Sequence, residues 1–243
     1  MISNKTKTII FLGSTLLLIF GFKANAGTGP VIMASWQAKN YIPTWFTGKI
    51  LPVLNTGIEV KAEFIDNGKI INLMDPNCEP PKDQNDTKPH PCRVRWYLNS
   101  DLVLNEENGY GIKSLFFENK DVYKGNDIQV TVTVPFYKNG SITKTVFIPV
   151  MSPEGVIDVP NFNRTVDKGE NLITAWPLFF NSIDNLSFKW TMDNQDIGQN
   201  SPVLKLTVDP KTVSGTEISM RVQIQNLKDR MQFSESSARL KVK

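Results

Sequence analysis

One short pattern of alternating apolar and polar residues around a tryptophan occurs twice in this chain, and it constrains the fold more than any other feature. The two copies cover residues 93–99 and 187–193, with Trp96 and Trp190 in the middle, and a polar turn follows each copy. Alternation with a period of two that ends in a turn is typical of a half-buried β-strand. The repeat therefore predicts two related β modules, each built around one core structural tryptophan.

A second match supports an internal duplication. Residues 125–132 align with residues 215–222, and in both stretches a glycine precedes a strand whose apolar side chains alternate. The glycine lies 29 residues after Trp96 in the first copy and 25 residues after Trp190 in the second. A glycine allows a bend, and the alternating apolar set fills one face of a sheet. We therefore expect the same strand order in both halves.

Strand signals recur along the rest of the chain. In the first half they cover residues 31–38, 58–65, 102–104, 112–118, 128–134 and 142–148, and in the second half residues 156–159, 171–180, 203–208, 218–224 and 238–242. Residues 66–69 are a turn signal, Asn139-Gly140 predicts a hairpin, and no convincing amphipathic helix is present. Turn-forming residues at 150–155 mark a boundary. We therefore expect a first sandwich over residues 27–152 and a second over residues 153–243.

This patterning resembles the immunoglobulin-like and PKD-like domains that occur in tandem on bacterial surface and secreted proteins. The resemblance is carried by Trp96 and Trp190 on a central strand and by the late glycine-x-acid-isoleucine strands at 125–132 and 215–222. The inter-sheet disulfide of antibody domains and the Trp-Asp-Phe-Gly-Asp-Gly signature of PKD domains are both absent. The resemblance implies an all-β fold of two tandem immunoglobulin-like β-sandwiches, in which each tryptophan packs between two sheets.

Residues 1–26 have the three regions of a secretory signal peptide. Lys5 and Lys7 give a basic start, residues 9–22 form an apolar run, and Ala24-Asn25-Ala26 is an A-x-A cleavage site. The run has 14 residues, whereas spanning a bilayer takes about 20. Cleavage before Gly27 is therefore favoured, and an uncleaved membrane anchor over residues 6–26 is the alternative. Either way we expect an exported protein, secreted or at the cell surface.

The charge balance argues against anionic partners for the chain as a whole. The leader carries three lysines and no acidic residue, so its removal leaves 24 basic and 24 acidic residues. A neutral mature chain has no global field to attract nucleic acid or an anionic membrane. We expect no nucleic-acid partner, and membrane contact only through the N-terminal segment if it stays uncleaved.

The two cysteines, Cys78 and Cys92, are expected to form a disulfide in an exported protein. They enclose a polar, proline-rich segment that cannot form a core, so the bond would staple the loop 78–92 just before the first tryptophan strand. The alternative is a metal site with His90 as a further ligand. Two cysteines and one histidine fall short of the usual four zinc ligands, and their spacing matches no zinc pattern.

Residue types that could support catalysis occur in patterns with simpler structural interpretations. His90 lies between two prolines in the stapled loop, and no Gly-x-Ser-x-Gly elbow is present. Acidic residues at turns, where they stabilise the backbone, include Glu106, Glu107, Asp121 and Asp127. The acidic turn of Asp193, Asn194 and Asp196 suggests calcium, but it lacks a full ligand loop. We predict no catalytic residue, no cofactor and no metal.

An aromatic segment is the strongest sign of a binding surface. Its members are Trp36, Tyr41, Trp45 and Phe46. They either form an exposed patch for a partner protein or a sugar, or Trp36 enters the first core and the others cover a sheet edge. Both interpretations stay open from the sequence.

These features predict a non-enzymatic exported protein of tandem immunoglobulin-like modules. Its role would be that of a structural, adhesive or protein-interaction unit at the cell surface or in the envelope. The alternative is a carbohydrate-binding or accessory module that uses the exposed aromatics of residues 36–46. The expected partner is thus a protein or a glycan at the cell surface.

Overall fold

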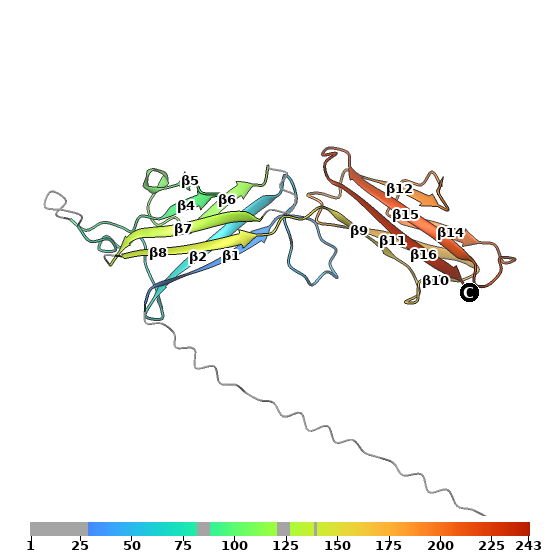
Figure 1. The fold of residues 1–243 in the computed structure, drawn as a ribbon, viewed down its shortest axis with the longest axis horizontal. Coiled ribbons are helices and arrows are strands. Elements are labelled where there is room, and N and C mark those ends of the chain that lie inside the picture. The colour runs from blue at the N-terminus through green and yellow to red at the C-terminus, as the bar shows by residue number, and fades with distance from the viewer. Residues whose placement is uncertain (1–28, 82–87, 121–126, 139) are drawn as a thin grey trace, which may run out of the picture.

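The computed structural model describes residues 29–81, 88–120, 127–138 and 140–243. The expected leader, Asp121, Gly125 and Asn139 lie outside these residues. The described chain is almost entirely β-structure and forms two sandwich modules placed end to end (Figure 1). This confirms the predicted all-β fold. Within the described ranges, no helix has both the length and the apolar character needed to cross a bilayer.

The first module consists of two antiparallel sheets. One sheet contains β1 (Val31–Ala38), β2 (Gly57–Asp66) and β6 (Ser114–Glu118), with the short β3 (Lys69–Ile70) also pairing with β2. The other has the order β5 (Asp101–Leu104), β4 (Arg95–Leu98), β7 (Ile128–Tyr137) and β8 (Gly140–Ile148). A single 3₁₀ turn, η1 (Glu106–Asn108), follows β5.

The second module repeats this arrangement. One sheet has the order β14 (Val203–Val208), β11 (Gly169–Leu178) and β9 (Glu154–Asp158). The other has the order β10 (Thr165–Val166), β16 (Phe233–Val242), β15 (Glu217–Asn226), β12 (Leu186–Met192) and β13 (Gln195–Asp196). Strands β9, β11, β12, β13, β14, β15 and β16 thus take the places of β1, β2, β4, β5, β6, β7 and β8. Both modules are immunoglobulin-like sandwiches.

Each module has its own hydrophobic core, as the alternating pattern predicts. On β2, the side chains of Ile58, Val60, Ala62 and Phe64 are all buried on one face. The buried residues of the first module form one cluster around Trp96, and those of the second form another around Trp190. Period-2 alternation works as a predictor here because each sheet has one face against the core and one in water.

The two tryptophans occupy equivalent positions down to their hydrogen bonds. Both side chains are fully buried. Trp96 pairs with Val132 of β7, and Trp190 pairs with Val222 of β15. The Trp96 indole Nε1–H donates to a backbone carbonyl at 3.0 Å, and that of Trp190 does the same at 2.8 Å. In both modules the acceptor lies in the segment that leads into the strand after the hairpin, so each indole ties that segment to the core.

The polar turn after each tryptophan is also repeated. Each is a two-residue hairpin loop with both residues at positive φ, Asn99-Ser100 in one module and Asp193-Asn194 in the other. This is the geometry of a type I′ turn, which favours Asn and Asp. The Asn99 side chain accepts the backbone N–H of Gln129 at 3.0 Å, and the Asp193 carboxylate accepts that of Ser219 at 2.9 Å. The acidic character of this turn therefore has a structural cause.

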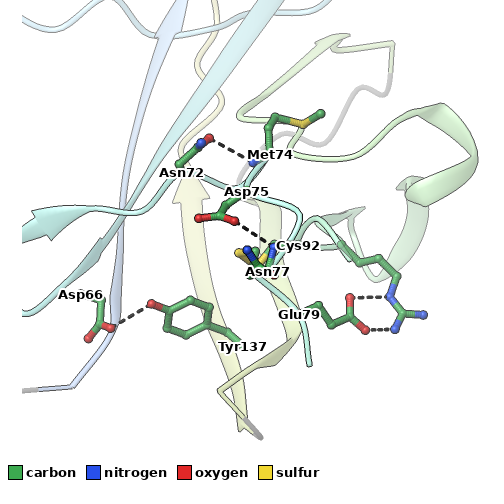
Figure 2. Close-up of a disulfide and its surroundings, with 10 residues drawn as sticks. Asp66, Asn72, Met74, Asp75, Asn77, Glu79, Cys92 and Tyr137 are labelled. Carbon is green, nitrogen blue, oxygen red and sulfur yellow. Dashed lines mark hydrogen bonds and ion pairs between the residues drawn. A yellow bond between two sulfur atoms is a disulfide. The ribbon is translucent and has the colours of Figure 1, made fainter. Parts of the chain in front are cut away.

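Cys78 and Cys92 form the disulfide that the sequence predicts, with their Cα atoms 5.1 Å apart (Figure 2). Cys92 is fully buried, and both cysteines pack against the first core. Closing a loop of this length contributes about 3 kcal/mol in the chain-entropy model. Beside the disulfide, Glu79 and His90 exchange two backbone hydrogen bonds, of 2.8 and 3.0 Å. A single β-bridge between Glu79 and His90 thus lies next to the disulfide.

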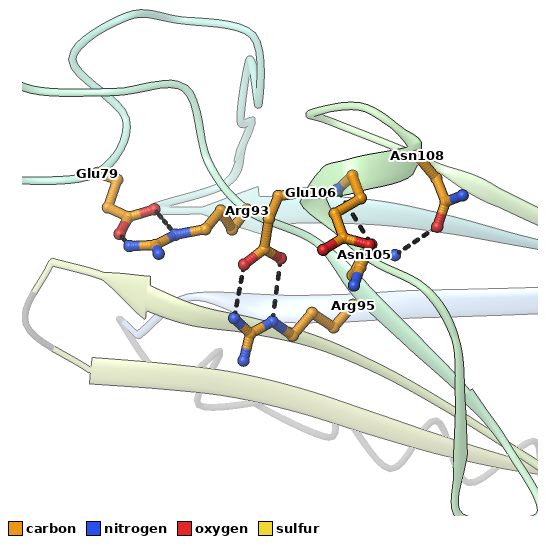
Figure 3. Close-up of polar contacts among 7 residues, drawn as sticks. Glu79, Arg93, Arg95, Asn105, Glu106 and Asn108 are labelled. Carbon is orange, nitrogen blue, oxygen red and sulfur yellow. Dashed lines mark hydrogen bonds and ion pairs between the residues drawn. The ribbon is translucent and has the colours of Figure 1, made fainter.

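Two arginine–glutamate pairs brace the same end of the module (Figure 3). Arg93 and Glu79 form a buried ion pair, in which Nε donates to Oε2 at 2.8 Å. Arg95 on β4 makes a bidentate pair with Glu106 of η1, with N–O distances of 2.7 and 3.2 Å. The hydrogen bonds from Arg95 lower the pKa of Glu106 from its usual value to about 2. Glu106, considered as a candidate catalytic acid, is therefore held as a structural carboxylate.

The Arg95–Glu106 pair makes the stability of the first module dependent on pH. The pKa of Glu106 is lower in the folded chain than in the unfolded chain, so its contribution is complete above about pH 4.5 and is lost as the pH falls towards 2. We expect Glu106→Gln to lower the free energy of unfolding by about 1 kcal/mol at neutral pH, because the pair is partly exposed. Denaturant titrations should show this difference shrinking between pH 4.5 and pH 2.

Glu107→Gln is the matched control, since Glu107 is exposed on the same turn. It should change the stability little at any pH. A wild-type advantage over Glu106→Gln that persists unchanged at the lowest pH would contradict the proposed role of the ion pair.

Candidate functional site

The segment that contains most of the predicted aromatic patch lies between the two modules. Residues 39–56 connect β1 to β2, and in Figure 1 this loop leaves the first module beside the start of the second. The Tyr41 backbone N–H donates to the carbonyl of Phe180 at 2.7 Å, and the Phe179 N–H donates to the carbonyl of Tyr41 at 2.9 Å. We call residues 39–56 the joint segment, because it pairs with the chain just after β11.

An apolar cluster fills the space between the joint segment and the second module. Val53, Leu178 and Phe179 are buried in it, and the partly buried members are Ile42, Phe46, Ile50 and Leu51. The rings of Phe46 and Phe179 meet edge to face, with centroids 5.5 Å apart. This is the favoured geometry for an aromatic pair. Burial of these side chains stabilises one particular placement of the two modules.

A network of hydrogen bonds around Asn181 fixes the orientation of the joint segment against the second module. The Asn181 amide donates to the carbonyls of Leu54 and Asn55 at 3.2 and 2.9 Å, and its oxygen accepts from the Thr56 hydroxyl at 2.9 Å. The fully buried Gln232 donates to the same Leu54 carbonyl at 3.2 Å and accepts the Asn181 backbone N–H at 3.1 Å. Hydrogen bonds fix orientation in a way that apolar burial alone does not.

Phe179 shows how closely the joint is specified. It has a φ of 65°, which is unusual for a bulky residue and costs about 1–3 kcal/mol. Its N–H donates to Tyr41, and its carbonyl accepts the Asn40 side-chain amide at 2.6 Å. Both polar groups of this strained residue are therefore satisfied by the first module. The hydrogen bonds from the first module therefore stabilise the positive-φ conformation of Phe179.

The four aromatic residues singled out from the sequence have separate roles. Trp36 lies on β1, is partly buried against the first core, and is covered by the Lys49 ammonium at 3.5 Å from the ring centroid. Burial there lowers the pKa of Lys49. Tyr41 and Phe46 belong to the joint. Of the four, Trp45 is the most exposed, with 49% of its surface accessible.

Trp45 meets a second tryptophan that the sequence pattern did not single out. Trp176 points outward from β11, and the two rings are edge to face with centroids 5.9 Å apart. Together with Val156, Ile157 and Asp158 of β9 they line a hollow of about 280 Å³, which we call the tryptophan hollow. Trp176 donates from Nε1 to the Asp158 carboxylate at 3.4 Å. An apolar wall with one fixed carboxylate can hold a small ligand and orient its hydroxyl groups.

The alternation along β11 shows that Trp176 faces outward, but it does not show that Trp176 belongs to a site. Ile173 and Ala175 are buried on β11, so alternation places Trp176 on the outer face. The sequence around Trp176 does not indicate that a loop of the first module covers part of that face. Among the described residues, no three His, Cys, Asp or Glu side chains gather in a way that could hold a metal ion.

The joint yields a direct prediction for Asn181. We expect Asn181→Ala to lower the free energy of unfolding by about 1–3 kcal/mol, because it removes the acceptor of the buried Thr56 hydroxyl and the two hydrogen bonds to the carbonyls of Leu54 and Asn55. It should also broaden the pair-distance distribution obtained from small-angle X-ray scattering, because the two modules would vary more in their mutual placement. Asn163→Ala, at an exposed position of the same module, is the control. Unchanged stability and scattering in Asn181→Ala would show that the network does not hold the modules.

Comparisons with known proteins give likenesses in fold only. No protein-family model matches the chain, and no curated protein is similar to it in sequence. Among solved structures, the three N-terminal domains of the Hoc outer capsid protein of bacteriophage RB49 are 11% identical, with a TM-score of 0.38 over 87% of this chain and 59% of that chain. The fibronectin(III)-like modules of Clostridium thermocellum CbhA are 13% identical, with a TM-score of 0.28 over 86% and 93% of the two chains. The four N-terminal immunoglobulin domains of Dscam1 isoform 4.44 are 15% identical, with a TM-score of 0.31 over 89% and 70%.

Proposed function

We propose that this chain is a non-enzymatic exported protein that acts as a structural or adhesive unit at the cell surface or in the envelope. The observation that carries the proposal is the joint between the modules. Its buried cluster and the Asn181 network hold two sandwiches at one mutual placement. A binding unit that presents surfaces at a fixed spacing gains from such rigidity, because less orientational freedom is lost when it binds.

Further support comes from two acidic residues whose carboxylates have structural partners. Glu106 is paired with Arg95, and the Asp193 carboxylate is bonded to a backbone N–H. The disulfide is compatible with an oxidising compartment outside the cytoplasm. The leader sequence points the same way, with its A-x-A site before Gly27.

The export part of the proposal is tested by the N-terminus of the protein in its native cell. Mass spectrometry should find a chain that starts at Gly27 and whose cysteines resist alkylation without prior reduction. Ala26→Asp should block cleavage and retain the leader, because the site needs a small residue there. Asn25→Asp, at the tolerant middle position, is the control. A chain that keeps Met1 and has free thiols in the cytoplasm would refute the proposal.

A second candidate function is supported by the tryptophan hollow. Trp45 is half exposed beside Trp176, and Asp158 supplies acceptor oxygens at the edge of the hollow. Sugar rings combine apolar C–H faces with hydroxyl groups, so this combination suits a glycan. On this interpretation the binding site includes side chains from both modules, and the aromatic segment supplies only Trp45.

Glycan-array binding of the mature chain tests this candidate. We expect Trp45→Ala to weaken binding about five- to tenfold, since a stacked aromatic contributes about 1 kcal/mol beyond its buried area. Phe147→Ala is the control, because Phe147 is an exposed aromatic of the first module outside the hollow. Binding that Trp45→Ala leaves intact would exclude the hollow as the glycan site.

A further inference from the structure

The outer face of the second module carries a polar pocket that plays no part in the joint. It has a volume of about 380 Å³ and is lined by Arg164, Thr191, Asn194, Ser219, Arg221, Ser237, Ala238 and Arg239. We call it the basic pocket, since three of its side chains are arginines and none is a carboxylate. A volume in this range holds a small molecule rather than a single water.

The strand register explains how the basic pocket is assembled. Thr191 of β12 pairs with Arg221 of β15, which pairs with Ser237 of β16. In the next row of the same outward face, Ser219 pairs with Arg239. Two arginines and three hydroxyl groups therefore share one patch of the sheet. Because alternation points them all away from the core, they remain available to a ligand.

Arg164 completes the pocket from outside the sheet. It lies in the loop before β10, and its backbone carbonyl accepts the N–H of Lys241 on β16 at 3.0 Å. This bond fixes the loop beside the edge of the sheet. Asn194, in the type I′ turn after β12, also lines the pocket. The donors thus come from four separate parts of the chain.

Nearby carboxylates neutralise little of the positive charge of the pocket's arginines. Arg221 contacts Glu235 at 3.3 Å, and both side chains are about half exposed, so the pair is weak. In the part of the chain that the structure describes, no carboxylate lies within ion-pair distance of Arg164 or Arg239. Guanidinium groups have a planar set of donors that matches an oxyanion, and hydroxyl and amide groups can complete its hydrogen bonds.

We propose that the basic pocket binds the phosphate or sulfate group of an anionic small molecule or of a substituted sugar. Arg164 and Arg239, with the weakly paired Arg221 beside them, suit an oxyanion better than a neutral ligand. The pocket has room for the group that carries the oxyanion as well. This local site is consistent with the neutral mature chain, because the charge is gathered in one place rather than spread over the surface.

NMR titrations of the mature chain test this proposal. Glucose 6-phosphate and glucose 6-sulfate serve as probes, and glucose is the neutral control. We expect amide shifts that gather at the basic pocket with one or both charged probes, and none there with glucose. The probe with the higher affinity identifies the preferred oxyanion. Binding should weaken as the salt concentration rises.

Charge-neutral variants of single arginines sharpen the test. Arg239→Gln and Arg164→Gln should each weaken binding about tenfold, as expected for the loss of a charge-assisted hydrogen bond. Arg230→Gln is the matched control, since Arg230 is exposed in the loop between β15 and β16 and does not line the pocket. The proposal fails if neither charged probe shifts the pocket amides at millimolar concentration. It fails equally if Arg230→Gln weakens binding as much as the pocket variants do.

Discussion

The buried indole N–H of each core tryptophan is the constraint on which each module depends. A donor of this kind needs an acceptor, because an unpaired polar group in a dry core costs about 1–3 kcal/mol. Trp96 and Trp190 both find a backbone carbonyl in the segment that crosses from one sheet to the other. The indole ring therefore fills the core, and its N–H holds the crossover segment against that core. The same contact occurs at equivalent positions of the two modules, whose strand orders correspond.

The contact between the joint segment and the second module restricts the motion of the two sandwiches about the short link between them. Strand β8 ends at Ile148 and β9 begins at Glu154, so the link alone could act as a hinge. The joint segment prevents this by reaching from the first module to the end of β11. Its hydrogen bonds hold Phe179 in a conformation that an isolated second module would have less reason to adopt. The second module is thus completed by residues that belong to the first.

The sequence was sufficient for the longer strands and insufficient for the shortest strands and the surfaces. Strand β2 was predictable because its alternation records a core face and a solvent face within one stretch. The short β3, β10 and β13 were missed, since two residues are too few for any periodicity. The joint segment was noticed for its aromatic residues, but its partners lie more than 120 positions away in the sequence, as the Thr56–Asn181 hydrogen bond shows. Likewise, Arg164, Arg221 and Arg239 form no local pattern and meet only through the register of β15 with β16 and the loop before β10.

The two binding surfaces proposed for the second module differ in what they require of the first. The tryptophan hollow lies on the outer face of the β14-β11-β9 sheet, and one of its walls is Trp45 from the joint segment. The basic pocket lies on the opposite sheet and takes every lining residue from the second module. Occupation of one surface therefore does not obstruct the other. Any change that loosens the joint should deform the hollow and leave the basic pocket intact, because only the hollow is shared between the modules.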